Sequence, residues 1–102
     1  ASFNLGKLLA AAGRPAEALA RFRGAVDASP AFGTGHLYLA KSLLDAGDLA
    51  GAGRAARKGL ASNPDPRIEP LGHYVLADVY SRLGREQDAA RELALAKRKS
   101  AP

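Results

Sequence analysis

Residue types that could do chemistry are few in this 102-residue sequence, and they do not gather into a reaction site. The two histidines, His36 and His73, stand 37 positions apart, the chain has no cysteine, and no close pair of carboxylates accompanies either histidine. A protein metal site needs three or four such ligands. We therefore predict no metal site and expect packing or surface roles for both histidines.

Nucleotide binding and nucleophilic catalysis are not indicated either. Gly51 and Gly53 do not form a phosphate-binding loop, because they fall inside a predicted helix rather than after a strand. Serine and threonine are few, no nucleophile elbow occurs, and the carboxylates are scattered among basic residues. The sequence therefore predicts a protein that is not an enzyme and that has no catalytic residues and no cofactor.

Positive charge is the main chemical bias of the chain, which has a formal net charge of +5. Basic residues cluster at Arg54, Arg57 and Lys58 and again at positions 97–99. Such clusters suit nucleic acid or anionic lipid. However, the helix dipole also favours Arg and Lys near helix C-termini, and the aromatic residues that would stack on bases are not interleaved with them. A basic surface that binds nucleic acid therefore ranks as a secondary hypothesis, and no specific nucleic-acid partner is predicted.

The elements that carry these residues are predicted to be helices in one domain covering 1–102. The apolar 47% of the chain is mainly Ala and Leu, with few Val and Ile, which favours an all-α fold. No apolar run is long enough to span a membrane, and no signal-peptide pattern opens the chain. Because the first residue is not Met, we expect either a piece cut from a longer protein or a processed chain. The absence of cysteine leaves the compartment open.

The sequence repeats itself with steps of 34 and then 37 positions. Small residues in the repeat allow helices to pack closely, its glycines suit the positive φ of a helix C-terminus, and Pro30 and Pro64 end a unit. The pattern predicts units of about 1–32, 33–66 and 67–102, with helices at about 2–12, 15–28, 33–46, 49–62, 68–83 and 86–99. The corresponding sets are Leu5, Leu39 and Leu76; Gly6, Ala40 and Ala77; Gly13, Gly47 and Gly84; Ala18, Ala52 and Ala89; and Ala25, Gly59 and Ala96.

This spacing resembles the tetratricopeptide repeat family, whose unit of 34 residues has small residues, a glycine turn and a terminal proline at these places. The resemblance covers essentially the whole chain. It implies a right-handed α-solenoid of three repeats and six helices that acts as a protein-binding scaffold through its concave face. The sequence departs from the family pattern at Ser2, where an aromatic is usual, in the three glycines at 51, 53 and 59, and in three extra residues within 63–70.

The resemblance also implies which residues would meet a partner protein or peptide. Lys and Arg would pair with carboxylates, Leu and Tyr would take apolar side chains, and Asp would meet a basic residue. A plain solvated helix surface is the alternative. The sequence lacks the Lys, Asn and Arg set with which some members grip a C-terminal carboxylate, so binding of chaperone tails is not predicted. The expected partner-binding residues are Phe3, Lys7, Leu37, Lys41, Leu44, Asp45, Tyr74, Asp78 and Arg82.

A third hypothesis is self-association, or docking onto the rest of a larger enzyme. Repeat arrays normally end in a polar helix, whereas the last predicted helix carries both Leu93 and Leu95 on different faces. Either the rest of a longer chain or a homodimer partner could cover that end. The Ala-rich and Arg-rich composition is similar to that of bacterial repeat arrays attached to larger enzymes, so we expect a bacterial domain. The identity of the partner is left open.

Overall fold

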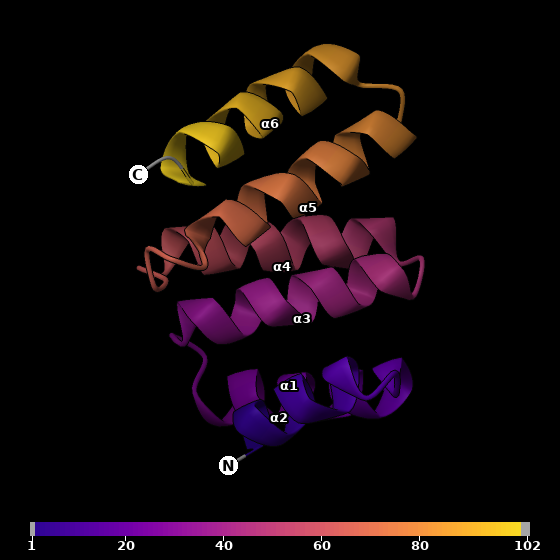
Figure 1. Cartoon of the computed structure of the whole chain (residues 1–102), viewed down its shortest axis with the longest axis vertical. Helices are drawn as coiled ribbons and strands as arrows, with labels where there is room; N and C mark the ends of the chain where they lie inside the picture. Colours follow the sequence, from indigo (N-terminus) through magenta and orange to yellow (C-terminus); the bar gives the residue numbers. More distant parts are fainter. Residues whose placement is uncertain (1, 101–102) are drawn as a thin grey trace.

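A computed structural model describes residues 2–100, and every regular element in that range is an α-helix. The six helices form three pairs, α1 with α2, α3 with α4 and α5 with α6, which stack along the long axis of the molecule (Figure 1). The predicted all-α repeat solenoid is confirmed, and each predicted helix end lies within one residue of the observed end. The helices are α1 (Ser2–Ala11), α2 (Pro15–Ala28), α3 (Gly33–Asp45), α4 (Leu49–Ala61), α5 (Glu69–Arg82) and α6 (Glu86–Ser100).

The turn inside each helix pair depends on a glycine with positive φ. Gly13, Gly47 and Gly84 have φ angles of 76°, 87° and 78°, as their place after an apolar helix predicts. The helices after the first two turns, α2 and α4, each begin with a local signal. Pro15 occupies the first turn of α2, and the Asp48 side chain accepts a hydrogen bond of 2.9 Å from Gly51 N at the start of α4. The glycine turns and the signals at the helix starts therefore determine where the helices of a pair begin and end, independently of the packing between pairs.

A continuous core cluster extends from α2 to α5 and contains many small residues. Phe22, Leu37 and Val75 are the largest fully buried side chains. Alanines at the repeated small positions, such as Ala18 and Ala52, are completely buried. Because their side chains occupy so little space, neighbouring helix axes can approach closely and the larger side chains fill the remaining volume.

The linker between the second and third pairs is longer than the one between the first and second, spanning 62–68 rather than 29–32. It therefore holds the three extra residues seen in the sequence. Asp65 N donates a hydrogen bond of 2.9 Å to Thr34 Oγ1, and the Asp65 carboxylate accepts one from Arg67 N. The hydrogen bonds from the Arg67 side chain and backbone hold the pKa of Asp65 below its ordinary value of 3.8. This linker is thus anchored to the start of α3.

Candidate partner-binding surface

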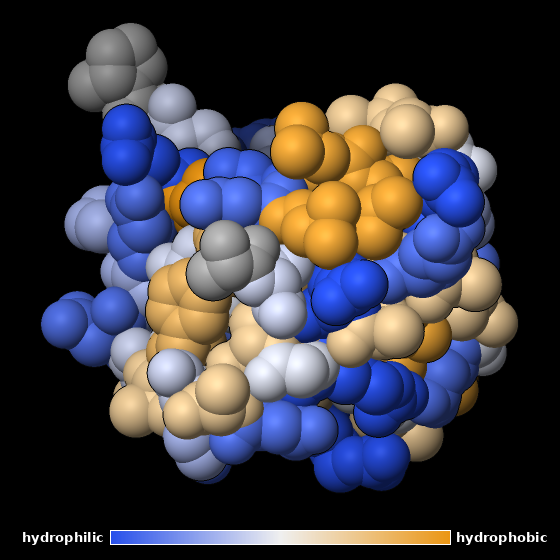
Figure 2. All heavy atoms as spheres, turned by 90° about the horizontal axis from the view of Figure 1, so that it is seen from below, coloured by the Kyte–Doolittle hydropathy of each residue, from blue (hydrophilic) through white to orange (hydrophobic). Residues whose placement is uncertain are grey.

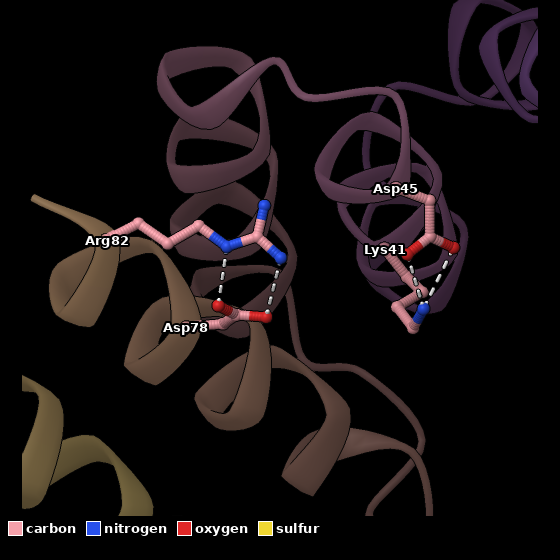
Figure 3. A network of polar contacts seen from close by, with 4 residues as sticks. All are labelled: Lys41, Asp45, Asp78 and Arg82. Atoms are coloured by element: carbon pink, nitrogen blue, oxygen red, sulfur yellow. Dashed lines mark hydrogen bonds and ion pairs between the residues drawn. The ribbon is translucent and has the colours of Figure 1, made fainter.

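The first helices of the second and third pairs each carry an ion pair at equivalent positions of the repeat (Figure 3). On α3, Lys41 Nζ donates to both carboxylate oxygens of Asp45 at 2.7 and 2.8 Å. On α5, Arg82 donates to both oxygens of Asp78 at 2.8 and 3.4 Å. The order of the charges is reversed between the two helices. All four side chains are about half exposed, so each pair adds only about 0.5 kcal/mol to stability.

Lys7 takes the equivalent position on α1, but its environment differs. Ala11 stands where α3 has Asp45, so this helix lacks the acidic member of the pair. The Lys7 ammonium instead lies 5.5 Å from the ring centroid of Phe3 and 5.6 Å from that of Tyr38. An ammonium at this distance is attracted to the face of an aromatic ring. The positive charge of Lys7 is therefore held over an aromatic surface without being neutralised by a carboxylate of its own helix.

A hollow of about 380 Å³ opens beside this cation. Phe3 and Tyr38 form an edge-to-face pair in its wall, with ring centroids 5.2 Å apart. Arg67, whose side chain is 88% exposed, adds a second cation. The complete lining is Phe3, Lys7, Thr34, Tyr38, Asp65, Arg67 and Ile68. Tyr38 and Arg67 were not among the expected partner-binding residues; the aromatic type of Tyr38 on a predicted first helix is the signal that would have pointed to it.

A second hollow, of about 580 Å³, lies between α5 and α6. Tyr74 and Asp78 line it from α5, and Leu93 lines it from α6. Tyr74 is 42% exposed and Leu93 37%, although both side chains are large. Small residues, Ala77, Ala89 and Ala90, form much of the remaining lining. The hollow therefore combines an open apolar base with a charged edge.

The structure narrows the set of residues expected to meet a partner. Leu37 has no exposed surface and Leu44 only 5%, so both belong to the core and neither can take a partner's side chain in this conformation. Lys7, Lys41, Asp45, Tyr74 and Arg82 are exposed, and Phe3 and Asp78 are partly exposed. The first hollow brings together Phe3 and Lys7, and the second brings together Tyr74 and Asp78.

Each of the two histidines contacts one polar partner in the described part of the chain. His73 Nδ1 lies 2.8 Å from Glu92 Oε1, and His36 Nε2 lies 2.8 Å from the carbonyl oxygen of Pro30. Residues 2–100 contain no group of three or more His, Asp or Glu side chains arranged to hold a metal ion. None of the helices in this range has the length and hydrophobicity required to cross a bilayer.

Comparison with protein families agrees with the helical repeat. A tetratricopeptide repeat family model matches residues 9–72, more than half of the chain, and a second tetratricopeptide repeat model matches residues 70–94. No curated protein gives a significant match. The two matched segments together run from the end of α1 into α6, across the glycine turns and the small buried residues described above. The chain therefore belongs to the tetratricopeptide repeat family.

Proposed function

We propose that the chain is a non-catalytic scaffold that holds a segment of another protein against the exposed surface of α1, α3 and α5. Proteins of this repeat architecture use the extended surface of the stack for binding. The observation that carries the proposal is the hollow in which Lys7 lies over Phe3 and Tyr38. An aromatic base beside a cation that forms no ion pair within residues 2–100 is a surface suited to a partner's apolar and acidic side chains.

The rest of the surface adds polar selectivity to that contact. The pairs Lys41–Asp45 and Asp78–Arg82 present both signs of charge in opposite order on neighbouring first helices. Tyr74 exposes a large side chain next to Asp78 in the second hollow. A partner segment that runs along this surface would meet an aromatic and basic region first and alternating charges afterwards. Complementary charges of this kind fix the register of a bound segment more than its affinity.

Selection from a displayed peptide library tests the proposal. Fluorescence anisotropy would then give the Kd of selected peptides for the wild-type chain and for Lys7→Ala and Tyr74→Ala. We expect each substitution to weaken binding about fivefold or more, since truncating a central interface residue removes more than about 1 kcal/mol. Lys97→Ala is the matched control, because Lys97 is exposed on α6 and lines neither hollow. Equal affinity of all four proteins would reject the proposed surface.

A second candidate function, self-association, is favoured by the outer face of α1. Leu8 is 68% exposed and Leu5 38%, whereas Val79 and Leu76, at the equivalent positions of α5, are 3% and 4% exposed. Figure 2 views the molecule from the α1–α2 end and shows strongly hydrophobic atoms gathered on that face. Exposed apolar surface of this kind favours association. We propose that a second copy of the chain covers it.

Light-scattering chromatography across a dilution series tests the second candidate. A dimer or larger species that dissociates in Leu8→Ser supports self-association through α1. Leu83→Ser is the control, because Leu83 is 56% exposed and directly follows α5, which belongs to the helix pair at the opposite end of the stack. A wild-type chain that stays monomeric at every concentration excludes self-association and leaves the peptide-binding proposal unaffected.

A further inference from the structure

Two histidines occupy the same place in successive repeats, but only one of them faces a carboxylate. His73 on α5 has Nδ1 2.8 Å from Glu92 Oε1 on α6, and the two side chains are only 11% and 16% exposed. The residue 37 positions before Glu92 is Ala55, on α4. His36 on α3 therefore has no such partner, and its Nε2 donates to the carbonyl of Pro30. A carboxylate present in the third pair is missing from the second.

A cavity of about 340 Å³ lies at the place where the carboxylate is missing. His36 and Ala55 both line it. Three cations, Arg23 from α2 and Arg54 and Lys58 from α4, line it as well. Within residues 2–100 none of these three side chains forms an ion pair. The cavity thus gathers three cations that have no ion-pair partner within the described chain.

The remaining lining explains what kind of group would fit. Leu39 and Leu43 are buried and supply an apolar base. The single carboxylate in the lining, Asp48, is already engaged as the cap of α4 through Gly51 N. Arg guanidinium groups bind carboxylates with two parallel hydrogen bonds, and such charge-assisted bonds are the strong ones. His36 can donate from Nδ1 as well when its ring is protonated.

We propose that this cavity binds an acidic side chain of a partner polypeptide, which takes the place that Glu92 fills in the third pair, while a neighbouring apolar residue of the partner rests on Leu39 and Leu43. The inference deepens the proposed function, because it assumes that the chain holds another polypeptide, but it assigns a different surface. The site lies between α2, α3 and α4, whereas the proposed scaffold surface lies on α1, α3 and α5. The cavity has an apolar base and room for one carboxylate at the position equivalent to Glu92. These features favour a peptide over a nucleic-acid backbone, which would need a longer row of basic residues.

The site can be tested by a substitution whose own side chain would occupy the cavity. Ala55→Glu places a carboxylate where the third pair has Glu92, so it should pair with the nearby cations and occupy the cavity. The probe is a fluorescein-labelled peptide of alternating Leu and Glu, with an alternating Leu and Gln peptide for comparison, followed by anisotropy at physiological salt. We expect the Glu peptide to bind wild type and to bind Ala55→Glu about tenfold more weakly or not at all. The Gln peptide should bind wild type as weakly as the Glu peptide binds Ala55→Glu.

Two further variants control for the change in net charge and for possible misfolding of Ala55→Glu. Ala94→Glu makes the same change in net charge on an exposed position of α6 and should leave the Kd within about twofold of wild type, since distant exposed charges are screened. Arg54→Gln changes an exposed side chain of the cavity and should weaken binding about fivefold or more even if Ala55→Glu folds poorly. Circular dichroism of each variant verifies the helical fold.

Several results would overturn the site. Unchanged affinity in both Ala55→Glu and Arg54→Gln would do so, as would equal binding of the Glu and Gln peptides or no binding of the Glu peptide by wild type. If the Glu peptide is lost with Lys7→Ala but kept with Ala55→Glu, the acidic segment binds the α1 surface, and the proposed function survives without this site. An oligothymidylate that displaces the Glu peptide from wild type at physiological salt would identify a nucleic-acid surface instead.

Discussion

Gly59 lies so close to Leu37 that a Cβ atom on Gly59 would be 2.6 Å from Leu37 Cδ2 and 2.9 Å from the backbone oxygen of Gly33. Gly59→Ala should therefore destabilise the fold by about 1–3 kcal/mol through overpacking. This is the opposite of the gain of about 1 kcal/mol that Ala brings to an unhindered helix position. Urea unfolding followed by circular dichroism measures the change.

Gly24→Ala is the matched comparison for that prediction. Gly24 lies in the middle of α2, and a Cβ built on it would meet nothing within 4 Å. We expect the substitution to raise the free energy of unfolding by about 0.5–1 kcal/mol. If Gly59→Ala also raised it, the close approach of α4 to Leu37 would not be a constraint on this chain.

The His73–Glu92 contact joins α5 and α6 where both side chains are largely buried. Glu92→Ala leaves His73 without its partner and should lower the free energy of unfolding by about 1–3 kcal/mol. Glu86→Ala serves as the control, because Glu86 is exposed and its hydrogen bond with Ser81 is long at 3.4 Å. Similar losses in the two variants, measured by urea unfolding, would argue against a specific role for the buried pair.

The turn between α5 and α6 tests the backbone conformation of glycine separately from packing. Gly84 has a φ of 78°, and a Cβ there would meet nothing within 4 Å. Gly84→Ala should nevertheless lower stability by about 1 kcal/mol or more, because L-residues disfavour the left-handed region. Gly84→Asn should lose less, since Asn tolerates that region better. Thermal unfolding should therefore give a higher Tm for Gly84→Asn than for Gly84→Ala. A higher Tm for Gly84→Ala would indicate that side-chain crowding, and not the positive φ, determines the loss.

The Asp65–Arg67 contact predicts a dependence on acid. The hydrogen bonds from Arg67 lower the pKa of Asp65 in the folded chain below 3.8. A carboxylate with a depressed folded-state pKa contributes stability above its unfolded pKa, and the contribution is lost as the pH falls through the folded value. The difference in Tm between wild type and Asp65→Asn should therefore be small but positive at about pH 5 and should fade towards about pH 2. A difference that stays constant over this range would contradict the assignment.

Local patterns in the sequence were sufficient to predict the helices and their turns. The recurrence of Gly13, Gly47 and Gly84 after apolar stretches predicted three helix ends, and all three glycines have the expected positive φ. Such signals are reliable because a helix end depends on the conformation of a few neighbouring residues. The hollow beside Lys7 could not be predicted in the same way, because its lining comes from two helices and a linker that are far apart in sequence.

By itself the sequence determined the helical repeat, since its spacing of small residues, glycines and prolines is the pattern of stacked helix pairs. It could not determine which residues of the repeat are left for a partner. Leu37 and Tyr74 occupy the same place in successive units, yet Leu37 is fully buried and Tyr74 is 42% exposed. The difference arises because Gly72 of α5 brings its backbone against Leu37, whereas no helix within residues 2–100 covers Tyr74 in the same manner. Burial in a stack depends on the neighbouring repeat as well as on the residue's own repeat, so only the tertiary structure could separate the core from the surface.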